Sequence, residues 1–514
     1  MPHTDVIIIG AGLSGIGAGY HLQKFCPDRS YVILEGRPRL GGTWDKFRYP
    51  GIRSDSDMHT LGYSFKPWNA PKSISDGPSI LAYLQETADE YGISERIRFN
   101  RRMTAAHWST KTATWTVTVE VTDDDAHETS TESRTGTGSE TMAVTEQHTA
   151  NFLLVCSGYY SYKAGYQPTF EGQDDFAGPI IHPQDWPEEL DYTGKRVAII
   201  GSGATAVTLL PAMAGDAAHV TMVQRSPSYL LSRPSVDPIA RLLKRFLPDS
   251  WAHRIVRRKN VRLGTLLYNR TRTEPDKIRA FLIDGVRKGL NPDIDVDTHF
   301  TPRYNPWDQR LCLIPDGDMF DALNSGKASV VTDHIDRFVP EGVRMASGEV
   351  VEADIIVTAT GLQLVTLGEA DFFVDGNRID FSRTWTYKGL AYSDIPNMVS
   401  VFGYINQSWT LRSDMISRYV CRLLNHMRKT GNDIVVPRFR PSDRDMTPRP
   451  WIDDFSSGYM QRVMPLLPRQ GDREPWLNTQ RYERDVELID KADVADDVLQ
   501  FTSSDRVPTG SGRH

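Results

Sequence analysis

Cysteine is scarce in this chain of 514 residues. The four cysteines, Cys26, Cys156, Cys312 and Cys421, lie far apart in the sequence, and no C-x-x-C pair occurs. A zinc ribbon and a redox-active dithiol both need closely spaced cysteines, so the usual forms of both are excluded. No cluster of His, Cys, Asp and Glu has the spacing of metal ligands, and we expect no bound metal. Buried, unreactive thiols in a reducing compartment are the expected state of the four cysteines.

Long apolar runs and an excess of positive charge are also missing. No stretch of about 18 apolar residues occurs, so no transmembrane helix is expected. The formal net charge of −7 gives no sign of nucleic-acid binding, and we expect no nucleic-acid partner. The sequence enters a strand pattern almost at once and leaves no room for a signal peptide, which predicts a cytoplasmic protein. A length of 514 residues exceeds a single hydrophobic core and predicts two or three domains.

Glycine, by contrast, stands in two patterns that each predict a dinucleotide site. The first glycine fingerprint is Gly10-Ala11-Gly12-Leu13-Ser14-Gly15, directly after the apolar run 5–9. A second apolar run, Tyr31–Leu34, begins about 20 residues later and closes on Glu35. Glycines at these positions let the backbone approach a pyrophosphate that rests on a helix N-terminus. A carboxylate at that strand end accepts hydrogen bonds from a ribose diol, as FAD and NAD present it.

The second glycine fingerprint, Gly201-Ser202-Gly203-Ala204-Thr205-Ala206, follows the apolar run Val197–Ile200. Its next strand pattern, 220–223, ends in Gln224-Arg225-Ser226 without an acidic residue. An arginine at that position suits a 2′-phosphate, so Arg225, with Ser226, predicts NADPH. One such fingerprint is a weak signal, but each of these two has the required strand and helix around it. We therefore predict a chain that holds FAD first and NADPH second. Flavin disulfide reductases share this double plan but need the missing cysteine pair.

The order of the patterns predicts an α/β fold with two Rossmann-like dinucleotide-binding domains. The FAD-binding domain would comprise residues 1–150 and 380–514, and the NADPH-binding domain residues 151–379. Residues 123–148, which are rich in Thr, Ser, Glu and Gly, are expected to form a solvated loop or hairpin extension. The strand pattern 353–361 ends at Gly361, where the backbone would lie close to a cofactor. The polar residues 503–514 are expected to fray.

A helical insertion at about 237–310 is predicted within the NADPH-binding domain. Apolar residues recur at helical spacing in 239–247 and in 280–283. The stretch 241–272 is strongly basic, with Arg257-Arg258-Lys259 at its centre. A solvated helix face is the commoner explanation of such a run, and weak peripheral contact with an anionic membrane is the alternative.

Three spaced patterns resemble those of the type I Baeyer–Villiger monooxygenases, a family of flavoenzymes. The link before the second fingerprint fills every specified position of F-x-G-x-x-x-H-x-x-x-W-P, with Phe176, Gly178, His182, Trp186 and Pro187. The second pattern runs through Gly41-Gly42-Thr43-Trp44, Tyr49-Pro50-Gly51 and Asp55, and the third is the strand 354–361. The resemblance extends from Asp5 to roughly Trp476. Across the first 420 residues the chain is especially similar to the ethionamide monooxygenase branch, through 48–57 and 304–310.

The resemblance implies an NADPH- and O₂-dependent flavoprotein that converts ketones to esters or lactones through a C4a-peroxyflavin and also oxidises sulfides. Gly42, Thr43 and Trp44 would contact FAD, and Gly361 would lie near a cofactor. Arg310 matches the active-site arginine of the family, and Asp55 matches the carboxylate that positions it. The partners would be O₂ and a small ketone or sulfide.

Several alternatives stay open at this point. Many relatives carry lysine directly before the active-site arginine, but this chain has Gln309, so Arg225 would carry most of the 2′-phosphate recognition. The link residues His182 and Trp186 could organise domain rotation without touching substrate. In the segment 403–409, Tyr404 and Trp409 could line a substrate pocket or be core packing.

The activity also has rivals. A flavin monooxygenase that acts mainly on sulfur or nitrogen shares the plan but typically has tyrosine where Trp186 stands. An NADPH oxidase that releases peroxide, and a nucleotide-binding sensor without turnover, are more distant alternatives. The tryptophan and the proline after it favour Baeyer–Villiger chemistry.

Overall fold

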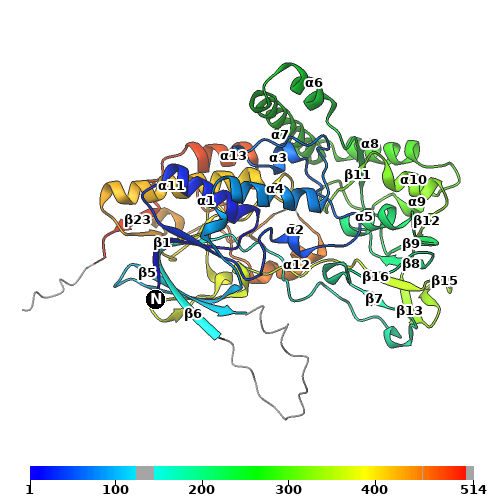
Figure 1. The fold of residues 1–514 in the computed structure, drawn as a ribbon, viewed down its shortest axis with the longest axis horizontal. Coiled ribbons are helices and arrows are strands. Elements are labelled where there is room, and N and C mark those ends of the chain that lie inside the picture. The colour runs from blue at the N-terminus through cyan, green and yellow to red at the C-terminus, as the bar shows by residue number, and fades with distance from the viewer. Residues whose placement is uncertain (123–143, 454, 505–514) are drawn as a thin grey trace, which may run out of the picture.

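Two large β-sheets organise the part of the chain that the computed structural model describes, residues 1–122, 144–453 and 455–504 (Figure 1). The first sheet contains β1 (His3–Ile9), β2 (Tyr31–Leu34), β3 (Ile97–Arg98), β4 (Arg101–Ser109), β5 (Thr114–Val121), β6 (Val144–Val155), β17 (Asp371–Val374), β18 (Asn377–Arg378) and β21 (Met398–Ser400). Its order is β18-β17-β4-β5-β6-β1-β2-β3, with β21 paired to β6. Strands β6, β1, β2 and β3 run parallel, and α1 (Leu13–Phe25) connects β1 to β2, as a Rossmann-like unit requires.

The second sheet is parallel throughout, with the order β12-β9-β8-β16-β7. Its strands are β7 (Ile180–Ile181), β8 (Arg196–Ile200), β9 (His219–Gln224), β12 (Ala328–Thr332) and β16 (Ile355–Thr358). The helix α5 (Ala204–Met213) connects β8 to β9, and α10 (Asp318–Asn324) packs beside it. A small antiparallel sheet of β13 (Ile335–Val339), β14 (Gly342–Met345) and β15 (Val350–Glu352) completes this half. The two sheets confirm the predicted α/β class with two Rossmann-like halves.

Sheet membership places the borders between the halves elsewhere than at residues 150 and 380. Strand β6 continues through the buried residues Phe152–Val155 beside β1, so it belongs wholly to the first sheet. Strand β17 joins the same sheet because it pairs in parallel with β4. The strand β6 also begins at Val144, and Val144–Ala150 pairs antiparallel with β5, so residues 144–148 agree with the hairpin extension rather than the loop expected for 123–148. Residues 123–143 of that expectation, and 505–514 of the expected frayed tail, lie outside the described residues.

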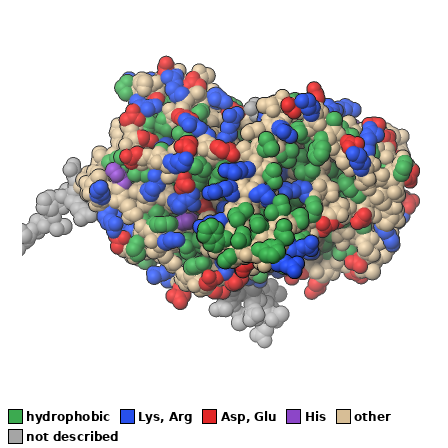
Figure 2. All heavy atoms as spheres, turned by 90° about the horizontal axis from the view of Figure 1, so that it is seen from above, with side chains coloured by type: hydrophobic (Ala, Val, Ile, Leu, Met, Phe, Trp, Pro, Cys, Tyr) green, Lys and Arg blue, Asp and Glu red, His purple; other side chains and the backbone are tan. Residues whose placement is uncertain are grey.

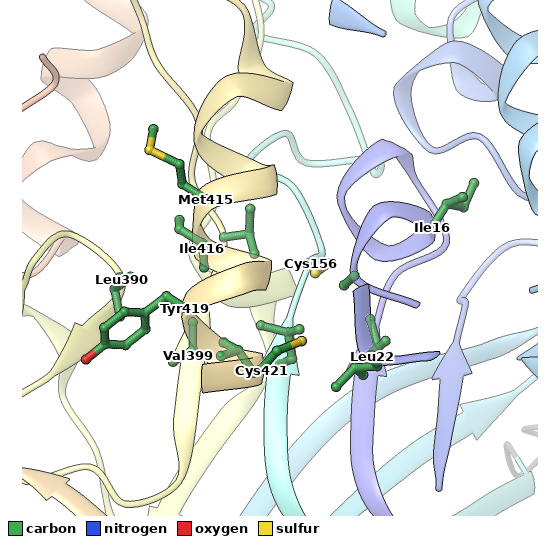
Figure 3. Packing of buried hydrophobic residues seen from close by; sticks show 14 of the residues in the cluster. Ile16, Leu22, Cys156, Leu390, Val399, Met415, Ile416, Tyr419 and Cys421 are labelled. Atoms are coloured by element: carbon green, nitrogen blue, oxygen red, sulfur yellow. The ribbon is translucent and has the colours of Figure 1, made fainter. Parts of the chain in front are cut away.

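The segment after residue 380 returns to the first sheet. The long helix α11 (Trp409–Thr430) packs along α1, and Figure 3 shows Met415, Ile416 and Tyr419 projecting from it, with Cys156 between the two helices. The remaining elements near this core are α2 (Thr43–Lys46), α3 (Met58–Leu61), α4 (Gly77–Glu90), β19 (Thr386–Tyr387), β20 (Ala391–Tyr392), β22 (Ile434–Pro437), α12 (Gly458–Val463), α13 (Tyr482–Asp485) and β23 (Leu499–Thr502). All four cysteines are free and buried.

The helical insertion consists of α6 (Pro238–Phe246), α7 (Asp249–Thr273), α8 (Pro275–Gly289) and α9 (Val296–His299). It lies between β10 (Leu230–Arg233) and β11 (Cys312–Pro315), which pair with each other in parallel. The insertion therefore begins where the sequence predicts, but its helices end before residue 310. Helix α7 packs on α3 of the first half, so the insertion bridges the two halves (Figure 1). Among the described helices, none is both long and apolar enough to cross a membrane.

Candidate active site

A cavity of about 730 Å³ lies where the two halves and the segment 403–409 meet. Both fingerprint regions reach it, the first through its glycines and the second through the first turn of α5. The predicted site residues that line it are Gly10, Gly12, Glu35, Gly42, Thr43, Trp44, Asp55, Thr205 and Arg310. A concave space with a few convergent polar groups, at the end of parallel strands, is where α/β proteins bind ligands.

Backbone packing explains the glycines of the first fingerprint. At Gly10, which has a φ of +98°, a Cβ would lie 2.7 Å from the carbonyl oxygen of Cys156. At Gly15 it would lie 1.9 Å from the carbonyl oxygen of Gly10, so only glycine fits. At Gly42, with a φ of +56°, a Cβ would lie 3.2 Å from the Cα of Gly12. Gly10, Gly12 and Gly42 line the cavity without side chains, so they leave a cradle that fits a pyrophosphate.

Glu35 directly follows β2, and its carboxylate is directed at the first fingerprint. Its Oε2 accepts from the Ala11 N–H at 2.6 Å, and its Oε1 accepts from the Arg37 N–H at 2.9 Å. Burial raises the pKa of the Glu35 carboxyl, and the two backbone N–H groups oppose that shift by stabilising the anion. A carboxylate offers about four acceptor positions, so positions remain for the hydroxyls of a ribose.

In the second fingerprint, as in the first, a glycine lies against a backbone carbonyl where a side chain would clash. A Cβ at Gly201, whose φ is +139°, would lie 2.3 Å from the carbonyl oxygen of Ala359, just after β16. At Gly203, which caps α5, and at Gly361, with a φ of +107°, a Cβ would meet nothing within 4 Å. The space beside both residues is therefore open to a ligand.

Arg225 and Ser226 follow β9 and are both exposed. The Ser202 hydroxyl donates to the Ser226 carbonyl at 2.8 Å, which ties this turn to the second fingerprint. An exposed guanidinium beside the start of a dinucleotide helix is available to a phosphate.

Arg310 and Asp55 meet in the cavity, although 255 positions separate them in the sequence. Nη2 of Arg310 lies 3.6 Å from Oδ2 of Asp55, and Nη1 donates to the Ile405 carbonyl at 2.9 Å. The Arg310 side chain is 37% exposed, and this exposure is toward the cavity that it lines. A guanidinium has five N–H donors, so these two contacts leave others for a ligand.

The charges of this pair are set by burial and by each other. Burial raises the pKa of the Asp55 carboxyl, and the Arg310 charge offsets that shift only in part. Burial also opposes the charge of Arg310, but Asp55, Tyr459 and Tyr159 outweigh it and hold its pKa above the ordinary value. Arg310 is therefore a fixed cation at every working pH.

The neighbours of Asp55 have distinct roles. Asp57 caps α3 by accepting from the Thr60 N–H at 3.2 Å, and it accepts from Asn260 of α7 at 2.9 Å. Arg53 lines the cavity and forms an ion pair with Asp318 at the start of α10. Asp57 is thus a structural anchor, whereas Arg53 remains available to a cofactor.

The link 176–187 lies along the second sheet. Phe176 is buried in the core of this half, and a Cβ at Gly178 would lie 2.2 Å from the Asp354 carbonyl oxygen. His182 Nδ1 accepts from the Gln184 N–H at 3.1 Å, so its Nε2–H donates to the Gly361 carbonyl at 3.0 Å. Burial lowers the pKa of His182, which keeps the ring neutral.

Trp186 is half-buried and Pro187 is exposed. Of the described residues that line the cavity, none belongs to 176–187. A role of the link in domain rotation stays a prediction.

An aromatic wall lines the cavity, and two of its members, Tyr159 and Tyr160, were missed by the sequence analysis, which considered only Tyr404 and Trp409. Tyr159 stacks on Trp409 with ring centroids 5.1 Å apart, and its hydroxyl lies 2.7 Å from that of Tyr160. Trp409 Nε1 donates to the Ser14 hydroxyl at 2.8 Å, so it lines the cavity beside the first fingerprint. Tyr404 also lines it but is buried, with its hydroxyl on Asp485 at 2.8 Å. The position of Tyr159–Tyr160, directly after the β6 strand end, was the signal that could have revealed the wall.

The described ranges contain no group of three or more His, Cys, Asp and Glu side chains placed to hold a metal ion. The site combines a glycine cradle, a ribose-type carboxylate, an aromatic wall and the fixed cation of Arg310.

Comparison with known proteins gives matches over nearly the whole chain. A family model described as flavin-binding monooxygenase-like matches residues 73–247, and one described as an NAD(P)-binding Rossmann-like domain matches residues 8–70. The FAD-containing monooxygenase EthA of Mycolicibacterium smegmatis is 49% identical over 501 residues, which cover 97% of each chain.

Two solved structures share the fold. A steroid monooxygenase bound to NADP superposes with a TM-score of 0.73 at 21% identity, covering 98% of this chain and 100% of that one. A cyclohexanone monooxygenase in an open form superposes with a TM-score of 0.72 at 20% identity and the same coverage.

Proposed function

Since the chain belongs to the family of FAD-containing monooxygenases, we propose that it is a FAD- and NADPH-dependent Baeyer–Villiger monooxygenase that also oxidises sulfides. The observation that carries the proposal is the Arg310–Asp55 pair in a cavity that both glycine fingerprints reach. The substrate would be a small ketone or sulfide, and O₂ would be the second substrate.

The first half would hold FAD. Gly10, Gly12 and Gly15 would let the pyrophosphate lie against the N-terminus of α1, and Glu35 would bind the ribose. Gly42, Thr43 and Trp44 would complete the cradle from α2. When bound, FAD would supply the redox chemistry for transfer of one oxygen atom of O₂ to the substrate, with NADPH as the source of the two electrons that convert the other atom to water.

Arg310 would supply the positive charge that such oxygen transfer needs. A ketone oxygen gains negative charge when its carbonyl carbon is attacked, and a fixed guanidinium beside it stabilises that charge without reorganisation. Asp55 and the Ile405 carbonyl hold the guanidinium in place, so they act as positioning groups. The wall of Tyr159 and Trp409 would exclude water from the reacting atoms.

The second half would hold NADPH, with Gly201, Gly203 and Thr205 at its pyrophosphate and Gly361 close to the cofactor. Arg225 and Ser226 would bind the 2′-phosphate. Because Gln309 replaces a second cation, we expect a preference for NADPH over NADH that is narrower than two cations would give.

Replacing Arg225 by alanine is expected to lower kcat/KM for NADPH about tenfold while leaving kcat/KM for NADH unchanged, since charge-assisted hydrogen bonds contribute roughly 1.5–3 kcal/mol. The measurement is steady-state NAD(P)H oxidation with each nucleotide. Arg233→Ala, which removes another exposed arginine eight positions on, is the matched control and should change neither value. Equal kcat/KM for the two nucleotides in the unmodified protein would refute the role of Arg225.

Aerobic turnover of the FAD-loaded protein tests the proposed activity as a whole. NADPH would be supplied with linear, cyclic and aryl ketones and with thioanisole, and the products identified by mass. Esters or lactones formed in step with NADPH use are the expected result. Sulfoxide without ester would indicate a monooxygenase that acts mainly on sulfur or nitrogen. Peroxide equal to the NADPH consumed would indicate an oxidase, and the absence of turnover would indicate a sensor.

A further inference from the structure

Most of the exposed large apolar side chains among the described residues lie in the helical insertion. In α6, Ile239, Leu242 and Phe246 are 46%, 58% and 72% exposed, and their spacing of three and four residues places them on one side of the helix. In α7 the exposed apolar side chains are Trp251, Ile255, Leu263 and Leu266. Monomeric proteins rarely expose so many large apolar side chains together to water, so this surface is a candidate interaction site.

Arginines border the apolar side chains. Arg254, Arg258 and Arg262 are exposed at intervals of four residues along α7, and Arg241 and Arg245 are exposed on α6. A groove of about 650 Å³ runs along α7 with both kinds of side chain in its walls, including Trp251 and Leu263. Figure 2 shows this face from above, with hydrophobic side chains gathered and Lys and Arg along their edge. We call these five arginines and seven apolar residues the outer face.

The opposite side of α7 is committed to the fold. Arg257 Nη1 donates to the carbonyls of His59, Thr60 and Gly62 at 2.9, 3.1 and 2.7 Å. Asn260 donates to Asp57, as described above. The helix is therefore fixed on the first half by polar contacts from one side, and its apolar side chains are exposed on the other. Figure 1 shows α6 and α7 at the outside of the molecule.

We propose that the outer face docks on the surface of a bilayer that contains anionic phospholipid. The apolar side chains would enter the boundary between head groups and acyl chains, and the arginines would pair with lipid phosphates. Helices α6 and α7 carry ten Lys and Arg against one Asp, while the whole chain has a net charge of −7. The positive charge is therefore concentrated on these two helices, where it can attract an anionic lipid surface although the whole chain is negatively charged.

The charge pattern disfavours a second copy of the chain as the partner. A two-fold symmetric contact through this face would oppose each set of arginines to the same set in the other copy. Like charges brought together in an interface cost several kcal/mol. An anionic lipid surface satisfies the arginines and the apolar side chains at once.

Co-sedimentation of the FAD-loaded, full-length protein with sucrose-loaded vesicles tests the proposal. Vesicles of phosphatidylcholine mixed with phosphatidylglycerol should pellet the protein, and vesicles of phosphatidylcholine alone should pellet much less. The triple variant R254Q/R258Q/R262Q should partition at least tenfold more weakly into the anionic vesicles, since each basic residue near such a surface strengthens binding roughly fivefold. Added salt should weaken the binding further.

The double variant L242S/W251S should also lose binding, and it should keep its melting temperature because both side chains are exposed. Leu466→Ser and Arg383→Gln, which alter an exposed apolar and an exposed basic residue outside the insertion, are the controls and should bind as the unmodified protein does. Equal sedimentation with both vesicle types, or the same loss in the controls, would overturn the proposal. A dimer in sedimentation velocity that dissociates in L242S/W251S would overturn it in favour of self-association.

Discussion

Replacing Arg310 by alanine should leave flavin reduction by NADPH close to the normal rate and lower product formation at least 100-fold, the range of about 10²–10³ found when one preorganised donor to a developing oxyanion is removed. The glycine cradle and Glu35 do not depend on Arg310, so FAD should remain bound. Anaerobic mixing with NADPH, followed by the loss of flavin absorbance, measures reduction. Aerobic assays of ester or sulfoxide, with peroxide measured in parallel, report oxygen transfer.

The conservative variant separates charge from geometry. Arg310→Lys keeps the charge but replaces the planar fork by a single point donor, so its rate should fall between those of the unmodified and alanine proteins. Peroxide formation should rise as product formation falls. In that side reaction NADPH, H⁺ and O₂ give NADP⁺ and H₂O₂. Product formation near the unmodified rate in Arg310→Ala would end the assignment of this residue.

A second large effect is expected in α11, on stability rather than on chemistry. Arg412 and Asp485 are 0% and 1% exposed, and Nε of Arg412 lies 3.1 Å from Oδ2 of Asp485. Arg412 Nη1 also donates to Asn478 at 2.7 Å. Replacing Arg412 by methionine leaves the carboxylate buried without its cation, and breaking a buried pair in this way costs about 3–5 kcal/mol. Urea unfolding measures the loss of unfolding free energy.

The matched control lies on the same helix. Arg418 pairs with Asp490 at 2.7 Å, but the two side chains are 30% and 29% exposed. Arg418→Met should cost no more than about 1 kcal/mol, as exposed pairs do. Equal losses in the two variants would mean that burial does not set the strength of these pairs. Because Asp485 also holds the Tyr404 hydroxyl, Arg412→Met should in addition weaken FAD retention.

Local sequence rules predicted the parts of this molecule that depend on neighbours in the chain. The glycine positions follow from contacts such as Gly15 against the Gly10 carbonyl, which any strand–turn–helix unit of this kind must make. Glu35 follows from the same unit. Helix α6 was predicted from its apolar spacing because that spacing is a property of the helix itself.

Contacts between distant segments were harder to predict. The meeting of Arg310 with Asp55 was expected only from the family resemblance, since no local pattern joins residues so far apart. The pairing of β17 with β4 involves a four-residue strand whose place is set by its neighbours, so the sequence did not reveal that residues 371–374 join the first sheet. The orientation of the exposed side of α7 depends on its contact with α3. Composition alone favoured a solvated face over a membrane contact, because it does not show which side chains of the helix remain exposed.

The hydrogen bonds of His182 have a consequence for motion. Its Nδ1 is an acceptor, so a proton added there would face the Gln184 N–H and break that bond. Because burial lowers the pKa of this ring, the unfolded chain takes up the proton at a higher pH than the folded chain does. The hydrogen bond therefore contributes its full stability at neutral pH, and this contribution is lost as the pH falls. At neutral pH, the hydrogen bond from His182 to the Gly361 carbonyl thus holds the link 176–187 and the turn at Gly361 together. In any rotation between the halves, these two segments must therefore move together.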